Sequence, residues 1–161
     1  MGNDYKIRQA QRTDCDALFK LIQELAAYEK LSDRVTGTAQ ALETHLFGEQ
    51  AFVEALVAEC EGNLIGFALF FTSYSTFLTK PGLYLEDLFV QEPYRGQGIG
   101  KALLKGVAQI VQDRGYGRLE WSVLDWNEPS IAFYRRMGAE VLPDWRICRV
   151  TEQSLQAVLS A

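Results

Sequence analysis

The sequence has little of what metal, redox or disulfide chemistry needs. Its 161 residues include a single histidine, His45, and an odd number of cysteines. Cys15, Cys60 and Cys148 lie far apart in the chain, so no pair of them has the spacing of zinc ligands. We therefore predict reduced cysteines, as in cytoplasmic proteins, and no metal site.

Long hydrophobic runs and an excess of positive charge are also missing. The sequence contains no stretch of 18 apolar residues, which a membrane span would require. Residues 1–6 lack the apolar core of a signal peptide. We therefore expect a cytoplasmic protein without a membrane partner. The formal net charge of −5 argues against a nucleic-acid partner, which requires a basic surface, and is compatible with a cationic substrate.

The length and composition predict one soluble domain over residues 1–161. Apolar residues make up 48% of the chain and charged residues 23%, as in ordinary globular proteins. A chain of 161 residues is long enough for one hydrophobic core. No repeat, low-complexity segment or interdomain linker divides it.

The hydrophobic periodicity predicts a mixed α/β sheet flanked by helices. Strands are expected over residues 5–8, 52–60, 64–74, 83–90, 118–125 and 144–150. Helices are expected from Thr13, as N-cap, to residue 30, and over 39–47, 98–114 and 128–137, with a last helix capped by Thr151. Residues 61–63 predict a hairpin turn, and Pro81 with Gly82 predicts a break before a strand. Antiparallel hairpins should therefore precede one strand–helix–strand unit.

The strongest motif is R-G-Q-G-I-G at residues 95–100, between a predicted strand and a predicted helix. Alternate glycines let the backbone approach a ligand closely and direct several N–H groups the same way. A helix N-terminus adds partial positive charge, which suits a pyrophosphate. Arg95 can pair with a phosphate directly.

Two other nucleotide loops fit this motif less well. In a Walker loop the lysine precedes Ser or Thr, but Lys101 is followed by Ala102, so magnesium would lack its hydroxyl ligand. A Rossmann loop needs G-x-G-x-x-G, and the third glycine here comes one residue early. An ordinary strand–helix turn is the structural alternative.

In this loop and along nearly its whole length, the sequence resembles the GNAT acetyltransferase superfamily. It looks most like the diamine (spermidine/spermine) N-acetyltransferases and their plant and bacterial relatives, which act on diamines, ornithine or thialysine. The segments that carry the resemblance are A-A-Y-E at 26–29, Y-S-T-F at 74–77, Y-L-E-D-L-F-V at 84–90, W-N-E-P-S at 126–130, F-Y at 133–134 and W-R at 145–146. The resemblance implies the GNAT acyl-coenzyme A N-acyltransferase fold, acetyl-coenzyme A as co-substrate and a homodimer.

The loop and the resemblance together give a set of coenzyme-site candidates. They are Leu88, Phe89, Val90, Arg95, Gly96, Gln97, Gly98, Ile99, Gly100, Lys101, Asn127, Glu128, Pro129, Ser130 and Tyr134. A free backbone N–H within 88–90 would polarise the thioester carbonyl.

Two adjacent carboxylates interrupt an apolar strand at Glu86 and Asp87. Buried carboxylates are costly unless they are paired or functional. Successive strand residues point to opposite faces, but proteins similar to this one carry a bulge here, which would change that. The resemblance makes Glu86 an amine-binding residue and a water-mediated base. A structural ion pair is the alternative, and for Asp87 both interpretations stay open.

The remaining candidates follow from the resemblance. It makes Tyr134 the general acid that protonates the departing thiolate, where base rates alone favour a core aromatic. It assigns Tyr28 and Glu29 to the amine site, where a polar helix end is the alternative. Trp121 and Asp144 complete the amine candidates, although Asp144 stands where animal polyamine enzymes carry a tandem glutamate. The tryptophans Trp121, Trp126 and Trp145 are expected in the core or in a cleft wall.

The sequence therefore predicts an acetyl-coenzyme-A-dependent N-acetyltransferase that acts on a primary amine of a small diamine, polyamine or diamino acid. Direct attack in a ternary complex is expected, because no cysteine lies within the matched motifs. Two alternatives are acetylation of a protein N-terminus or lysine, and a coenzyme-A-binding sensor without activity. Retention of Glu86 and Tyr134 beside an intact loop argues against the sensor.

Overall fold

The computed structural model describes residues 4–161, which form two compact units. The first unit reaches to Ser122 and the second runs from Val123 to Ala161. The expectation of one domain over the whole chain stays a prediction.

The first unit is built on a mixed five-stranded sheet in the order β1-β2-β3-β4-β5. The strands are β1 (Tyr5–Gln9), β2 (Glu54–Cys60), β3 (Asn63–Ser75), β4 (Lys80–Val90) and β5 (Leu119–Glu120). The first four pair antiparallel. β4 and β5 are parallel, and α3 (Ile99–Asp113) lies between them in the chain. The predicted hairpins followed by a strand–helix–strand unit are therefore confirmed.

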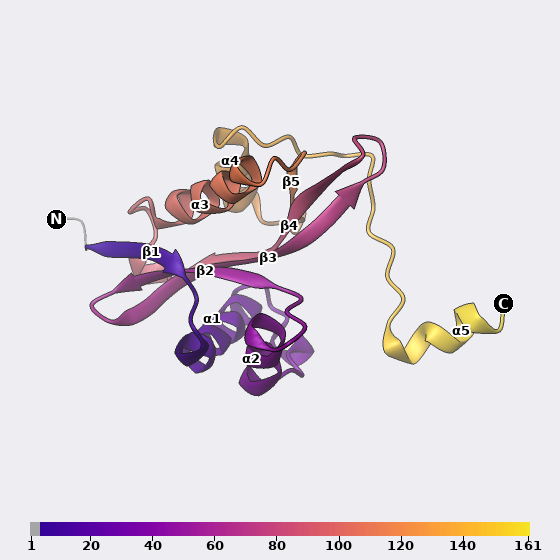
Figure 1. The fold of residues 1–161 in the computed structure, drawn as a ribbon, viewed down its shortest axis with the longest axis horizontal. Helices are drawn as coiled ribbons and strands as arrows, with labels where there is room; N and C mark the ends of the chain where they lie inside the picture. The colour runs from indigo at the N-terminus through magenta and orange to yellow at the C-terminus, as the bar shows by residue number, and fades with distance from the viewer. Residues whose placement is uncertain (1–3) are drawn as a thin grey trace. The chain divides into compact units, whose positions relative to one another are not determined.

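Helices cover both faces of this sheet. Figure 1 shows α1 (Cys15–Tyr28) and α2 (Ala39–Phe47) on one face and α3 on the other. Leu18, Leu21 and Leu25 of α1 recur at helical spacing and pack on Phe67 and Phe89 of the sheet. On the opposite face, Ile99, Leu103, Leu104 and Val107 of α3 are buried. Apolar side chains are therefore buried on both faces of the sheet that contains β4.

The start of α1 differs from the prediction that Thr13 is its N-cap. Residues Arg12–Asp14 form a 3-10 turn, and α1 begins at Cys15. The Asp14 carboxylate accepts the backbone N–H of Gln11 at 2.7 Å and pairs with Arg8 at 2.6 Å. The Arg8 guanidinium lowers the pKa of this carboxyl below its usual value. The Arg8–Asp14 ion pair, between residues six apart in the chain, accompanies this later helix start, and the sequence pattern did not reveal it.

Pro81 and Gly82 do not break the chain before β4, because both lie inside the strand, which pairs with β3 along its whole length. A side chain at Gly82 would meet the Arg118 carbonyl oxygen at 2.7 Å. The glycine is therefore needed for the close approach of the segment that leads into β5. The Pro81 carbonyl accepts the N–H of Gly117 at 2.8 Å, which ties the same two segments together.

The second unit contains helices but no described strand. It holds α4 (Glu128–Arg136), the 3-10 turn Glu152–Ser154 and α5 (Leu155–Leu159). Thr151 caps the 3-10 turn that leads into α5, near the predicted helix start. The strand predicted at 144–150 is absent, and the one predicted at 118–125 shrinks to Leu119–Glu120 in the first unit. A strand needs a partner for its backbone groups, and residues 144–150 have no ladder partner in the described chain.

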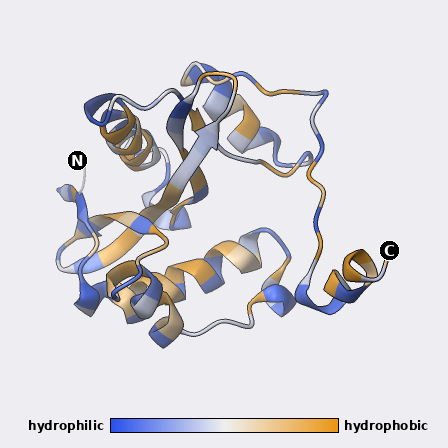
Figure 2. Ribbon diagram, turned by 45° about the vertical axis from the view of Figure 1, so that its right-hand side comes forward, coloured by the Kyte–Doolittle hydropathy of each residue, from blue (hydrophilic) through white to orange (hydrophobic). Residues whose placement is uncertain are grey.

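Exposed apolar side chains are concentrated in the second unit. Figure 2 shows hydrophobic colour on α5 and on the segment before it. Trp145 is 79% exposed and Trp126 is 47% exposed, so neither lies in a buried core, and the alternative expectation of a cleft wall stays a prediction. The other large exposed apolar residues of this unit are Val141, Leu142, Ile147, Val150, Leu155, Val158 and Leu159. Clusters of this kind mark interaction surfaces in soluble proteins.

Candidate active site

The glycine-rich segment has the backbone that the sequence predicts. The turn Glu92–Tyr94 follows β4, and α3 begins after Gly98. Gly96 and Gly98 both adopt positive φ, 76° and 84°, which residues with a side chain rarely adopt. A Cβ at Gly96 would meet nothing within 4 Å, so the outer side of this turn is open.

The N-terminus of α3 makes this turn suitable for an anion. The first N–H groups of a helix have no acceptor within the helix, and its dipole places partial positive charge there. The α3 N-cap is a glycine without a side-chain cap, so no side chain of its own covers these donors. The segment can therefore hold a phosphate group through backbone N–H groups.

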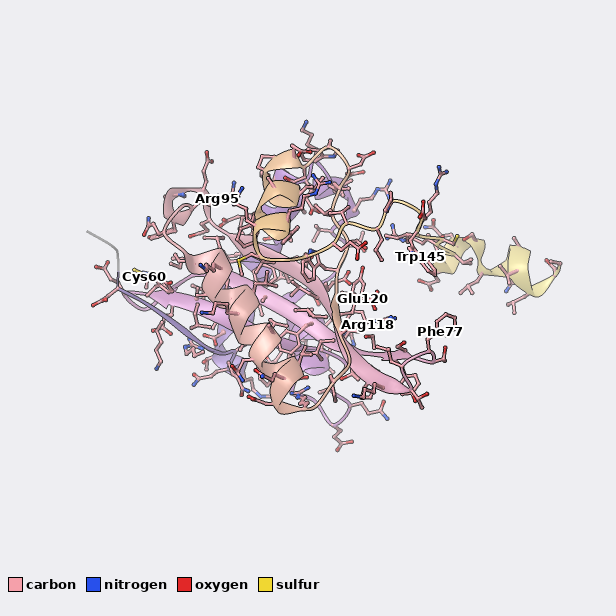
Figure 3. All side chains as sticks on the ribbon, turned by 90° about the horizontal axis from the view of Figure 1, so that it is seen from above. Cys60, Phe77, Arg95, Arg118, Glu120 and Trp145 are labelled. Atoms are coloured by element: carbon pink, nitrogen blue, oxygen red, sulfur yellow. The ribbon has the colours of Figure 1, made fainter. Side chains whose placement is uncertain are left out.

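The Arg95 side chain is held by contacts with the residues that precede the loop and with α1. Its Nε donates to the Val90 carbonyl oxygen at 2.8 Å. Its guanidinium carbon lies 4.7 Å from the ring centroid of Tyr28 and 5.6 Å from that of Phe89. Figure 3 labels Arg95 and, farther along the sheet, Arg118 and Glu120. Arg95 therefore contacts the ends of both β4 and α1.

The acidic strand contains the expected bulge. Leu85 pairs with Phe70 and Asp87 pairs with Leu69, so Glu86 has no residue opposite it in the β3 register. A bulge of this type changes the alternation of side chains along the strand. Leu69 lies on the sheet face that α1 covers. Asp87 is its cross-strand partner and therefore lies on the same face. Glu86 is exposed, whereas Asp87 is partly buried.

Asp87 has the most perturbed carboxylate of this region. Its burial raises its pKa to about 7, and the negative charges of Glu86 and Glu29 add to that effect. Burial also raises the pKa of Glu29, which directly follows α1. The end of α1 and the bulge in β4 therefore bring three carboxylates of the first unit together. A positive charge beside them would be stabilised by all three.

The sheet is incomplete next to this bulge. Within residues 4–161, β5 pairs only with Leu83 and Tyr84, so its ladder with β4 stops before Glu86. The side chains of Tyr84 and Ser122 are bonded through their hydroxyls at 2.7 Å. Trp121, the tryptophan predicted near the amine, is partly buried beside Ser122 in the chain. On its β5 side, β4 therefore has no ladder partner at residues 88–90 in the described chain, where the donor for the thioester carbonyl is predicted.

The other predicted site residues belong to the second unit. Asn127 is buried and its side chain accepts the N–H of Ser130 at 3.4 Å, so it caps α4 as expected. Pro129 lies in the first turn of α4, and Gly138 has a φ of 92° just beyond its end. Tyr134 is partly buried on this helix, its ring 5.4 Å from that of Phe133.

Asp144 lies on the exposed segment that was predicted to be a strand. The structure therefore brings the loop, Tyr28, Glu29, Glu86 and Asp87 into one unit, and places residues 127–130, Tyr134 and Asp144 in the other.

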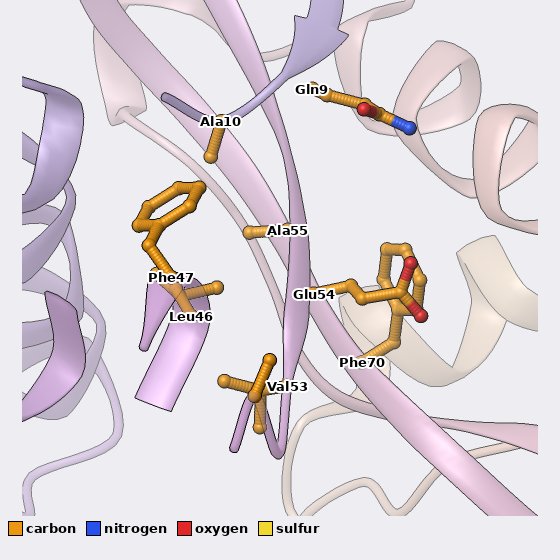
Figure 4. Close-up of a pocket in the computed structure, with 9 residues that line it drawn as sticks. Gln9, Ala10, Leu46, Phe47, Val53, Glu54, Ala55 and Phe70 are labelled. Carbon is orange, nitrogen blue, oxygen red and sulfur yellow. The ribbon is translucent and has the colours of Figure 1, made fainter. Parts of the chain in front are cut away.

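A pocket of about 180 Å³ lies apart from these residues, where α2 ends and β2 begins. Figure 4 shows Leu46, Phe47, Val53 and Ala55 on one side of β2, and Gln9, Glu54 and Phe70 on the other. Glu54 is held there by Arg114, whose two terminal nitrogens donate to its carboxylate at 2.9 and 2.7 Å. None of the predicted site residues lines this pocket.

Over residues 4–161, no group of three or more His, Cys, Asp or Glu side chains is arranged to hold a metal ion. In the same part of the chain, no helix is long and apolar enough to cross a membrane. All three cysteines are free thiols.

Comparison with known proteins identifies relatives over most of the chain. Residues 17–139 match the model of the acetyltransferase (GNAT) family. The chain is 34% identical to L-ornithine N5-acetyltransferase NATA1 of Arabidopsis thaliana, over 95% of this chain and 87% of that protein. It is 39% identical to thialysine N-epsilon-acetyltransferase of Bos taurus, over 93% and 94% of the two chains. A solved integron cassette protein of V. cholerae superposes with a TM-score of 0.81 at 26% identity, over 99% of this chain and 100% of that one.

Proposed function

The chain belongs to the acetyltransferase (GNAT) family and is an N-acetyltransferase, and we propose that its acceptor is a primary amine of a small diamine, polyamine or diamino acid. Acetyl-coenzyme A is the co-substrate of enzymes of this family. The observation that carries the proposal is the group of three carboxylates, Glu29, Glu86 and Asp87, in the first unit. Relatives named for ornithine and thialysine acetylation support the same class of acceptor.

An amine acceptor with a second polar or charged group suits this arrangement. The ammonium group must reach the site and lose one proton, because only the neutral amine has a lone pair. Glu86, exposed at the bulge, and Glu29, at the end of α1, can hold positive charge. A net charge of −5 also favours the approach of cations.

Asp87 is the better proton acceptor of the two residues at the bulge. Its pKa of about 7 lies near neutral pH, where a general base is most effective. In the proposed step, the ammonium gives one proton to the Asp87 carboxylate, directly or through water, and the nitrogen attacks the thioester carbonyl carbon. Asp87 later releases that proton to solvent. Glu86 then keeps the amine-binding part of the role predicted for it.

The glycine-rich loop and the end of β4 form the proposed coenzyme site. Backbone N–H groups from Gly96 to Lys101 would bind the pyrophosphate. A backbone N–H among residues 88–90 would stabilise the negative charge that develops on the carbonyl oxygen. Within residues 4–161, this edge of β4 has no ladder with β5, so its backbone donors are not used by that strand.

The final step needs an acid for the departing sulfur. When the tetrahedral intermediate collapses, the C–S bond breaks and coenzyme A leaves as a thiolate. We assign its protonation to the Tyr134 hydroxyl, which regains a proton from the acetylated nitrogen through solvent. The capped start of α4 fixes the helix that carries Tyr134.

An acceptor screen tests the proposal. The full chain would be incubated with acetyl-coenzyme A and putrescine, spermidine, ornithine, lysine or thialysine, and thiol release would be measured. We expect at least one of these amines to be acetylated with a kcat/KM about 100-fold above that of a monoamine such as butylamine. Acetylation of peptide N-termini or lysines alone would overturn the small-amine proposal, and coenzyme binding without any acetylation would favour a sensor.

We also propose that the chain forms a homodimer through the apolar side chains of residues 141–159. These include Trp145 and Ile147, which are 79% and 69% exposed. The proposal requires these side chains to form a contiguous apolar surface, which homodimers bury. Sedimentation of the wild-type chain at micromolar concentration should give the mass of two copies, and a monomer at all concentrations would overturn this proposal.

A further inference from the structure

Two contacts tie α1 to the segment that leads into the glycine-rich loop. The Gln91 side-chain nitrogen donates to both carboxylate oxygens of Glu24 at 3.0 Å. Four residues later on each element, the Arg95 guanidinium carbon lies 4.7 Å from the centroid of the Tyr28 ring. Residues four apart on a helix share one face, so the contacts of Glu24 and Tyr28 both lie on the same side of α1.

Arg95 uses only part of its guanidinium in these contacts. One face of the group lies over the Tyr28 ring, and Nε donates to the Val90 carbonyl. A guanidinium that stacks on a ring keeps its terminal N–H groups in the plane, where they can pair with a phosphate. Arg95 is exposed and directly precedes Gly96, the first open position of the loop.

We propose that Arg95 is a positioning residue that couples the two substrates, holding Tyr28 with its face and a coenzyme phosphate with its edge. Bound coenzyme would then fix Tyr28 and the neighbouring Glu29 in the orientation that receives the amine. The inference rests on the proposed function, because it takes the loop as the coenzyme site and the end of α1 as part of the amine site.

Thermodynamic linkage makes this coupling measurable from either side. If the coenzyme raises the affinity for the amine, the amine raises the affinity for the coenzyme by the same factor. One cation–π contact at an exposed position is a modest interaction. We therefore expect a coupling at the low end of the usual range, about fivefold.

Calorimetric titration of coenzyme A tests the coupling without turnover. The full chain would be titrated with coenzyme A, without amine and with saturating putrescine or ornithine, at ionic strength held constant with NaCl. In the wild type, the amine should lower the Kd for coenzyme A about fivefold. In Arg95→Lys, which keeps the charge but loses the planar stack, and in Tyr28→Leu, which loses the ring, the ratio should fall to about one.

The chain offers a matched control at Arg12. This guanidinium lies 5.7 Å from the Phe47 ring centroid, at the end of α2 and away from the loop. Arg12→Lys removes a comparable stack and should keep the wild-type coupling ratio. Kinetics add a second readout: in Arg95→Lys, the KM for the amine should rise about fivefold with kcat nearly unchanged.

The outcomes separate this inference from the proposed function. A wild type that acetylates amines but shows no coupling, or an Arg95→Lys variant that retains it, would overturn the role of Arg95 and leave the acceptor class intact. A wild type that acetylates none of the amines would overturn the proposed function itself. Loss of coupling in Arg12→Lys as well would show that the effect is not specific to the loop, and it too would overturn the inference.

Discussion

The two units differ sharply in how they bury apolar side chains. Among the buried apolar residues, only Ile131 belongs to the second unit, and all others lie in residues 4–122. The second unit instead exposes large apolar side chains from Trp126 to Leu159. A well-packed unit can hold binding groups in fixed positions, whereas a short chain with almost no core cannot be stable by itself.

This difference implies a division of work between the units. The first unit carries the glycine-rich loop and the three carboxylates, which include the proposed base Asp87, and these binding and proton-accepting groups need a rigid frame. The second carries Tyr134, whose proposed contribution is a single proton transfer. Changes in the first unit should therefore act on affinity and on pH dependence, and changes in the second on turnover or on assembly.

The largest expected effect is that of Tyr134→Phe. The change removes one oxygen and keeps the ring, so packing is nearly preserved. General-acid groups contribute about 10²–10⁴-fold, and water can partly replace a phenol, so we expect kcat to fall about 100-fold. Steady-state kinetics with the best amine, and calorimetry with coenzyme A, would measure the two quantities. A normal kcat would show that Tyr134 is not the acid, and a large loss of coenzyme affinity would contradict the division between units.

Gly98→Val tests the first unit. Gly98 has a φ of 84°, which is strained for any L-residue and most of all for a β-branched one. The loop would have to change shape, and we expect the affinity for acetyl-coenzyme A to fall at least about tenfold. Gly115→Val is the matched control, because Gly115 also has a positive φ, 65°, but follows the other end of α3. Equal losses of coenzyme affinity in the two variants would contradict the loop assignment.

The pH dependence tests the carboxylates of the first unit. The proposed base must be ionised, so kcat/KM of the wild type should fall about tenfold per pH unit below about pH 7. Glu86→Gln removes one of the two negative charges that raise the pKa of Asp87, and the fall should then begin at lower pH. In Asp87→Asn this fall in kcat/KM should be absent, because the ionising group has been removed. An unchanged profile in both variants would assign the base elsewhere.

Stability provides a separate measurement on Asp87. Its pKa is raised in the folded state above its ordinary value of 3.8, so the fold binds this proton more tightly than the unfolded chain does. Its unfavourable contribution is therefore absent at low pH, grows as pH rises from about 4 to about 7 and is complete above that. Asp87→Asn should raise the Tm by several degrees at pH 8 and have almost no effect at pH 4. A loss of Tm at pH 8 would indicate a structural role.

Local patterns predicted most of the first unit because local physics determines it. The apolar stripe of α3, the turn at Gly62 and the positive φ of Gly98 follow from residue type and spacing. Specific side-chain and backbone contacts were missed: the Arg8–Asp14 ion pair accompanies the later start of α1. The backbone at Arg118 packs closely on Gly82, and Pro81 lies within the strand there.

The candidate site was predicted unevenly for a similar reason. The loop and the bulge at Glu86 were visible in the sequence and in its resemblance to the family. The contact of Arg95 with Tyr28 was not, because the two residues are 67 positions apart and only the fold brings them together. The i, i+4 spacing of Glu24 and Tyr28, matched by that of Gln91 and Arg95, was the one available signal. The strand predicted at 144–150 failed because an alternating pattern does not supply a pairing partner.

The smallest expected effect on the chain itself is that of Trp145→Ala, and it tests the second unit directly. A side chain that is 79% exposed has little apolar contact to lose, so the free energy of unfolding at high dilution should change by less than about 0.5 kcal/mol. For comparison, Leu103→Ala, at a fully buried position of α3, should cost about 2–5 kcal/mol. If residues 141–159 pair with a second copy, the wild-type Tm should rise with protein concentration. Trp145→Ala should weaken that dependence, whereas Leu103→Ala should lower the Tm at every concentration. A Tm of the wild type that is independent of concentration would leave the exposed side chains without the proposed partner.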